Sequence, residues 1–163
     1  FAKGSADAIN PPLFSWAEWA LYQLSGDGER LARVWPHLAR YDAWLRGHQR
    51  GPEGLYWSSQ LGCGMDNSPR FAARWVDMSA QQALNARCLA LIAQVIGQPE
   101  TTVAAYQEEH AALTRQINRY MWDEKAGVYW DLDGKLEPWP ALTIAPFWTL
   151  LRMWCRPTGR SDW

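Results

Sequence analysis

The residues best suited to chemistry lie in one glycine-rich segment, Gly62-Cys63-Gly64-Met65-Asp66-Asn67-Ser68-Pro69-Arg70. Its carboxylate, Asp66, is a candidate general acid, because a carboxyl group that burial keeps protonated near neutral pH can donate a proton to a leaving oxygen. The same residues fit a plainer role, since an aspartate followed by Asn-Ser-Pro is a common turn sequence. From the segment alone, both interpretations stay open.

Other charged residues near this segment each allow two interpretations. Arg70 and Arg74 can hold a substrate carboxylate through paired hydrogen bonds, or they can form salt bridges within the protein. Glu18 stands alone in an apolar stretch, so it is either a second reactive carboxylate or one half of a buried pair with an arginine. Asp77 is interpreted as a helix cap. The three histidines lie on separate helical stretches without the spacing of metal ligands, so no metal site is predicted.

Tryptophan occurs 12 times in 163 residues. Aromatic rings can stack on the flat C–H faces of sugars, although core packing is the simpler interpretation of any single tryptophan. Tyr56 and Trp57 precede the Asp66 segment, and Trp75 follows it. We predict that these three residues line a sugar site.

Composition narrows the class of protein. The chain has the length of one domain, and 48% hydrophobic with 20% charged residues is typical of a globular fold. A net charge of −1 argues against nucleic acid or an anionic membrane as the main partner. Three cysteines without CxxC spacing favour a reducing, cytoplasmic location, and no cofactor is predicted. Because the sequence begins at Phe1, we also allow for a missing natural start and a lost signal peptide.

The hydrophobic pattern predicts an all-α fold with a small β-hairpin. Five helical stretches are expected, at residues 12–24, 29–49 with a break at Pro36, 79–96 capped by Asp77 or Ser79, 99–121 and 141–151. The first, third and fifth are broadly apolar, whereas the second and fourth carry one apolar stripe. This alternation favours two concentric rings of helices over an open α-solenoid, for which no repeat of fixed period is found. Residues 10–12, the long loop 50–77 and a hairpin at 123–137, turning at Asp133-Gly134, are expected along one rim of the rings.

Four segments together resemble the clan of trehalases and glycoside hydrolase family 63, most nearly its mannosylglycerate-hydrolase-like group. The resemblance covers roughly residues 8–150 and is most specific around Asp66. The segments are Asn10-Pro11-Pro12-Leu13-Phe14 with the following Trp16-Ala17-Glu18-Trp19, then Gly64 to Arg70, Trp75-Val76-Asp77-Met78-Ser79-Ala80, and Thr143-Ile144-Ala145-Pro146-Phe147-Trp148.

The resemblance implies an (α/α)6 barrel that hydrolyses an α-linked sugar, such as a mannosylglycerate- or trehalose-like substrate, with inversion. By resemblance Asp66 is the general acid, Gly64 approaches the sugar through its backbone, and Asn10 stands where trehalases place a glutamine. Inversion also needs a general base roughly 6.5–9.5 Å from the acid. The family places its base well after residues 143–148, with no room for it before Trp163. An aromatic-Trp-Asp segment of the family also has no counterpart before Phe1. The chain is therefore interpreted as a single domain, 1–163, that is about five helices of a larger catalytic barrel.

The ends of the chain and its partners complete these expectations. Residues 152–163 depart from the family pattern, and we interpret them as a frameshifted tail. The predicted substrate-binding residues are Asn10, Tyr56, Trp57, Gly64, Arg70 and Trp75, with an acidic aglycone held by Arg70 and Arg74.

A homo-oligomer is expected to cover the apolar flanks of the first and last inner helices. Two other functions stay open, a non-catalytic carbohydrate-binding remnant and a helical protein-interaction module.

Overall fold

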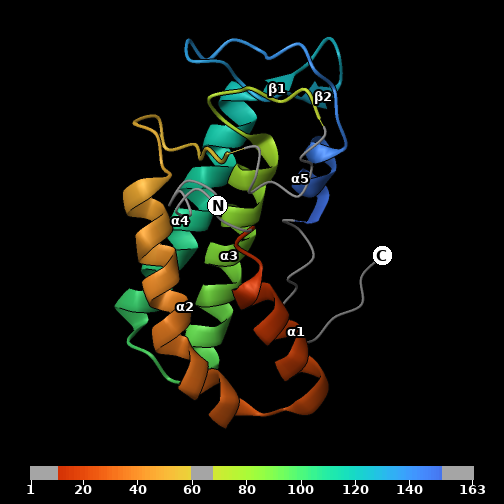
Figure 1. The fold of residues 1–163 in the computed structure, drawn as a ribbon. Helices are drawn as coiled ribbons and strands as arrows, with labels where there is room; N and C mark the ends of the chain where they lie inside the picture. The colour runs from red at the N-terminus through yellow and green to blue at the C-terminus, as the bar shows by residue number, and fades with distance from the viewer. Residues whose placement is uncertain (1–10, 60–67, 152–163) are drawn as a thin grey trace, which may run out of the picture.

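The structure, a computed structural model, describes residues 11–59 and 68–151 (Figure 1). Asn10, Gly64, Asp66 and the tail 152–163 lie outside the described residues. The elements are α1 (Phe14–Ser25), α2 (Gly28–His48), α3 (Val76–Val95), α4 (Glu100–Tyr120), β1 (Trp122–Asp123), β2 (Val128–Tyr129), the short 3-10 helix η2 (Ala145–Phe147) and α5 (Trp148–Leu151).

Helix α3 forms the centre of the molecule and is buried along nearly its whole length. It packs against α4 most extensively and also contacts α1, α2 and α5. In Figure 1, α2 and α4 lie on one side of α3, whereas α1 and α5 lie toward the other. The predicted all-α fold with a small hairpin is confirmed, and the arrangement is a partial helical barrel.

The start of α3 differs from the prediction. The helix begins at Val76, and the backbone N–H of Val76 donates to Asp131 Oδ1 at 2.8 Å. Asp77 lies inside the first turn, where its carboxylate accepts from the backbone N–H of Met78 at 2.8 Å, so it assists the start of the helix without preceding it. The Ser79 hydroxyl instead accepts a hydrogen bond from the backbone N–H of Tyr56 at 3.0 Å. The N–H groups in the first turn of a helix have no carbonyl partner within that helix. For Val76 the partner is the carboxylate of Asp131, 55 positions further along the chain.

The predicted break at Pro36 is also wrong. Helix α2 runs without interruption from Gly28 to His48 with Pro36 inside it. Its beginning is capped locally, because Asp27 accepts from the N–H of Arg30 at 2.8 Å. Leu31, Leu38 and Leu45 recur every seven residues, and their burial against the core outweighs the unfavourable proline.

The hairpin turns earlier than predicted. Trp122 pairs with Tyr129 and Asp123 with Val128, so the chain reverses at 124–127, where Gly127 has a φ of 67°. Asp133 does organise a second turn, since its carboxylate accepts from the N–H groups of Lys135 and Glu137.

Two helices are less buried or shorter than expected. On α1, predicted to be broadly apolar and so expected to be buried on most sides, only Ser15 and Trp19 are buried, whereas Phe14, Leu21 and Leu24 are exposed. The stretch predicted as one helix at 141–151 starts as the 3-10 turn around Pro146, and the described part of α5 begins at Trp148. The helices next to the central one therefore leave apolar side chains uncovered.

Candidate functional site

Three loops meet at the N-terminal end of α3, namely 50–59, 68–75 and 130–139. The N–H of Trp75 donates to the carbonyl of Tyr56 at 2.9 Å, and the N–H of Arg74 donates to the carbonyl of Leu132, also at 2.9 Å. These bonds confirm that the long loop and the segment after the hairpin share one end of the molecule. The described parts of the chain before and after Asp66 both belong to this end of the molecule.

Arg70 is the central residue of this end and is fully buried. Its guanidinium donates to Asp77 at 2.7 and 2.8 Å and to Asp131 at 2.6 and 2.8 Å, so four of its N–H groups are engaged. The guanidinium carbon also lies 4.2 Å from the centre of the Trp75 ring. We call Arg70, Asp77 and Asp131 the Arg70 clasp.

The clasp connects three parts of the chain through buried charges. Burial by itself would lower the pKa of Arg70, but the hydrogen bonds and charges of Asp77 and Asp131 outweigh it and raise that pKa above its ordinary value. The clasp holds two carboxylates and one guanidinium, and the positive end of α3 provides a further favourable partner for the excess negative charge. The backbone at residue 70 is thereby held against α3 and against the hairpin segment.

The expected substrate clamp of Arg70 and Arg74 is therefore corrected. Both paired edges of the Arg70 guanidinium are occupied by carboxylates of the chain, so none is left for a substrate. Arg74 likewise pairs with Glu53, with Nη2 of the arginine 3.2 Å from Oε2 of the glutamate. Neither arginine now supports an acidic aglycone.

The predicted aromatic residues lie close together, but two of them face the interior. Tyr56 is fully buried and its hydroxyl donates to Glu109 at 3.5 Å, while Trp75 is buried beneath Arg70 with its indole N–H on the carbonyl of Ala72 at 2.8 Å. Neither ring offers a stacking face to a sugar, which corrects that part of the prediction. Trp57 is half-buried and keeps an accessible surface. For Asn10, Gly64 and Asp66, which lie outside the described residues, the assigned roles stay predictions.

Glu18 has the arginine partner that one interpretation required. Arg30 donates to its two carboxylate oxygens at 2.7 and 2.8 Å. With both oxygens paired, the arrangement favours a structural role for Glu18 over that of a second reactive carboxylate.

A second polar cluster, not predicted from the sequence, lies between α2, α3 and α4. The buried Asp42 accepts from Gln82 at 2.6 Å, from Asn85 at 2.9 Å and from Arg46 at 2.6 Å. Burial raises the pKa of the Asp42 carboxyl, and the charge of Arg46 only partly opposes this. Arg46 also faces Glu109 at 3.5 Å. The signal in the sequence was the group of three neighbouring amides, Gln81, Gln82 and Asn85, on a broadly apolar helix.

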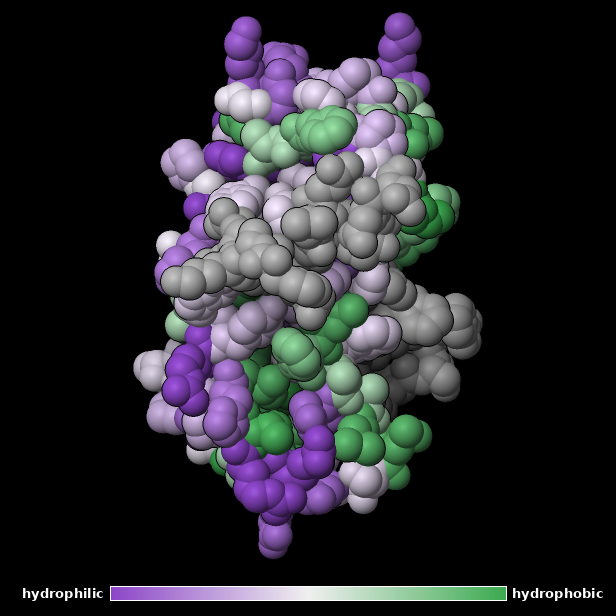
Figure 2. Space-filling view, in the orientation of Figure 1, coloured by the Kyte–Doolittle hydropathy of each residue, from purple (hydrophilic) through white to green (hydrophobic). Residues whose placement is uncertain are grey.

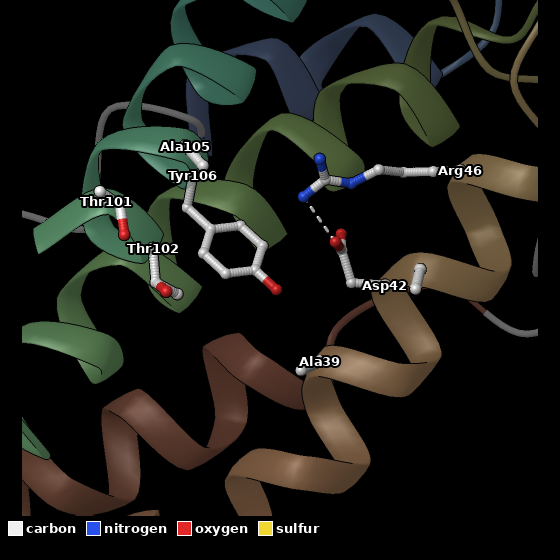
Figure 3. A pocket seen from close by; sticks show the side chains of 8 residues that line it. Ala39, Asp42, Arg46, Thr101, Thr102, Ala105 and Tyr106 are labelled. Carbon is white, nitrogen blue, oxygen red and sulfur yellow. Dashed lines mark ion pairs between the residues drawn. The ribbon is translucent and has the colours of Figure 1, made fainter. Parts of the chain in front are cut away.

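The cluster borders an open cavity of about 420 Å³ between α2 and α4 (Figure 3). The space stays open because most of the side chains that line it are small. Tyr106 extends across it from α4 toward Asp42 on α2. Burial is the main cause that raises the pKa of Tyr106, to about 12. The cavity lies on the α2–α4 side and does not include the three loops, so we do not assign the predicted chemistry to it.

Two further findings concern the described residues only. Across 11–59 and 68–151, no three His, Cys, Asp or Glu side chains gather in a way that would hold a metal ion. None of the helices in those ranges has the length and hydropathy needed to cross a bilayer.

Comparison with known proteins decides the family. Residues 3–153 match the model of the mannosylglycerate hydrolase MGH1-like glycoside hydrolase domain. The chain belongs to this family. The match to the MGH1-like domain includes the Asp66 segment, the Arg70 clasp and the helices that carry it.

Two relatives of the MGH1-like chain are longer than it is. An uncharacterized protein of Borreliella burgdorferi is 32% identical over 144 residues, which are 88% of this chain and 30% of that protein. The crystal structure of an uncharacterized conserved protein from Thermus thermophilus has a TM-score of 0.75 at 21% identity, and the match covers 93% of this chain and 51% of that one. The second likeness shows the fold. This chain spans about a third of the first protein and about half of the second.

Proposed function

We propose that this chain is part of the catalytic barrel of a glycoside hydrolase of family 63 type, which cleaves an α-linked sugar with inversion. Asp66 acts as the general acid and protonates the leaving oxygen. Gly64 and Asn10 contact the sugar, and the accessible face of Trp57 stacks on it. The observation that carries the proposal is the family match over residues 3–153, which includes the Asp66 segment.

The Arg70 clasp supports the assignment to this end of the molecule. Arg70 follows Asp66 by four positions in the sequence, and its buried bonds to Asp77 and Asp131 hold residue 70 at the N-terminus of α3. A general acid must stay protonated near neutral pH, whereas the positive end of α3 favours the charged carboxylate. Burial of the Asp66 carboxyl is therefore a requirement of the proposal.

The general base belongs to a part of the barrel beyond the segment that this chain matches. An inverting enzyme needs both carboxylates, so an assembly without the base binds sugar but does not turn it over. A carbohydrate-binding role without catalysis is the second candidate, and the two-oxygen pairing of Glu18 with Arg30 favours it for the chain alone, because Glu18 is then no substitute base.

The test has a binding arm and a product arm. Titration of the chain with α-linked disaccharides, followed by calorimetry, is expected to give saturable binding that Trp57→Ala weakens, with the exposed Trp122→Ala as a matched control. In a longer form that contains the rest of the barrel, proton NMR of the first product is expected to show the β-anomer released from an α-glycoside. Release of the α-anomer would contradict inversion, and no sugar binding by either form would contradict both candidate functions.

A further inference from the structure

The cavity between α2 and α4 is lined by both apolar and polar groups (Figure 3). The two helices each pack on α3, whereas direct packing between them is slight, so the space of about 420 Å³ stays open. Its apolar lining consists of the methyl groups of Ala39, Ala43 and Ala105. Its polar lining consists of Asp42, Arg46 and Tyr106, together with two threonines in the first turn of α4. We call this space the α2–α4 cavity.

Tyr106 points into the α2–α4 cavity and is only 9% exposed. Its ring is held in place, because the Trp35 ring lies edge-on to it at 5.9 Å between centroids and the guanidinium carbon of Arg46 lies 5.2 Å from its centre. The Tyr106 hydroxyl, in contrast, has no hydrogen-bond partner among residues 11–59 and 68–151. Since buried polar groups are nearly always hydrogen-bonded, a fixed ring with an unpaired hydroxyl indicates that a bound molecule supplies the partner.

Asp42 and Arg46 keep unused hydrogen-bonding capacity beside this hydroxyl. Asp42 Oδ1 accepts from the amides of Gln82 and Asn85. Among the described residues, Oδ2 accepts from Arg46 alone, at 2.6 Å, although a carboxylate oxygen can accept two hydrogen bonds. Nη1 of Arg46 has only a long contact, 3.5 Å from Glu109. The cavity therefore offers both a hydrogen-bond acceptor and a donor to a molecule that reaches Tyr106.

The charges around the α2–α4 cavity balance one another. Asp42 and Glu109 carry one negative charge each, and they pair with Arg46 and Arg50 at 2.6 to 3.5 Å. An ion that entered would leave water without gaining an unpaired counter-charge, so the cavity favours an uncharged molecule. Figure 2 shows mostly hydrophilic side chains along the left edge of the molecule, where α2 lies in Figure 1, so the surface here suits a water-soluble ligand.

The volume of the cavity suits a small organic molecule. One water occupies about 30 Å³ of the liquid, so a single water that bridges Tyr106 and Asp42 would leave most of the 420 Å³ unfilled. Pockets for small molecules have volumes of roughly 300–1,000 Å³. A pyranose sugar is uncharged, has C–H faces that can lie against methyl groups, and has hydroxyls that both donate and accept. These are the properties that the lining requires.

We propose that the α2–α4 cavity binds one neutral sugar unit. Hydroxyls of the sugar bond to the Tyr106 hydroxyl, to Oδ2 of Asp42 and to Nη1 of Arg46, and a C–H face of the ring lies against the alanine methyl groups. This site is separate from the loops at the N-terminal end of α3, to which we assign catalysis, and it does not depend on that assignment.

Fluorine NMR can observe this site directly. The chain has six tyrosines, so labelling with 3-fluorotyrosine gives one signal for each, and Y106F assigns the Tyr106 signal by removing it. On titration with glucose, we expect the Tyr106 signal to shift and to saturate in the millimolar range. Glucuronate, which adds a carboxylate to the same ring, is expected to bind more weakly. Equal or tighter binding of glucuronate would overturn the assignment to a neutral sugar.

Two substitutions of neighbouring exposed alanines on α4 give a matched pair. A105L fills the cavity and is expected to abolish the shift of the Tyr106 signal, whereas A104L, outside the cavity, is expected to keep it. Circular dichroism checks that both variants stay folded. A Tyr106 signal that glucose does not move, a shift that persists in A105L, or a shift that A104L also removes would each overturn the site.

The variant W57A separates this site from the sugar site proposed at the loops. W57A is expected to leave the Tyr106 shift unchanged, and loss of the shift in W57A would overturn the separate site. In calorimetry on the W57A background, Y106F is expected to weaken the remaining glucose binding by about 3–10-fold, because one hydrogen bond to a neutral group is lost. Unchanged affinity in W57A/Y106F would contradict the role of the Tyr106 hydroxyl. None of these results depends on whether Trp57 binds sugar, so failure of one site is distinguishable from failure of the other.

Discussion

At the scale of single residues, the molecule depends on buried charges that satisfy one another. Arg70 forms four hydrogen bonds to two carboxylates that come from opposite sides of the guanidinium. Asp42 is the centre of a comparable cluster further along α3, with an arginine and two amides as partners. A buried charge network of this kind is costly to break, because the partners that remain keep their charge away from water.

The first prediction follows for Arg70→Met. The variant leaves Asp77 and Asp131 buried next to each other without a cation, so we expect it to lower the free energy of unfolding by roughly 3–5 kcal/mol. Urea denaturation followed by circular dichroism measures this loss. Arg33→Met is the matched control, since the contact of Arg33 with Glu29 is long at 3.9 Å and exposed, and its loss costs about 0–1 kcal/mol. Equal effects of the two substitutions would contradict the structural role of the clasp.

At the scale of elements, α2 carries a proline that the packing of its neighbours tolerates. A proline inside a helix removes one backbone hydrogen bond and crowds the preceding turn. Pro36→Ala is therefore expected to raise the free energy of unfolding by about 1–3 kcal/mol. The adjacent exposed His37→Ala is the control and is expected to change stability by no more than about 0.5 kcal/mol. A destabilised Pro36→Ala protein would show that the proline supports a bend that the packing needs.

The hairpin gives a prediction on pH. Hydrogen bonds from the N–H groups of Ala126 and Lys125, together with the indole of Trp130, lower the pKa of the Asp123 carboxyl below its ordinary value of 3.8. The folded state thus favours the charged form, and its contribution to stability is complete above pH 3.8 and is lost as the pH falls through the lowered pKa. Asp123→Asn should be less stable than the original chain at neutral pH, and this difference should shrink toward about pH 2. A difference that grows on acidification would reverse the sign and reject this account.

Features that depend on local patterns could be predicted from the sequence, whereas features that depend on long-range contacts could not. Helices α2 and α4 follow their apolar stripes to within a residue or two of the predicted bounds. The predicted start of α3 was wrong because the side chain that caps it, Asp131, is 55 positions away and no local pattern indicates this contact. Arg70 was taken for a substrate ligand for the same reason, since one of its partners lies 61 positions further along the chain.

At the scale of the whole molecule, the structure is a partial helical barrel, and the inverting hydrolysis that we propose for it needs two carboxylates. The resemblance places only the acid within these 163 residues. We therefore predict that the isolated chain binds α-linked sugars without hydrolysing them. Product analysis by NMR after prolonged incubation with a saturating disaccharide measures this. Turnover that Glu18→Gln abolishes would show that a local carboxylate serves as the base.

The role of Asp66 is tested most directly by Asp66→Asn in a longer form that contains the rest of the barrel. Asparagine keeps the size of the side chain but cannot donate the proton, so hydrolysis of an unactivated α-glycoside is expected to fall by about 10²–10⁴-fold with the helical content unchanged. Asp133→Asn, in the turn after the hairpin, is the matched control and is expected to keep full activity. Normal turnover by Asp66→Asn on that substrate would contradict the proposed general acid.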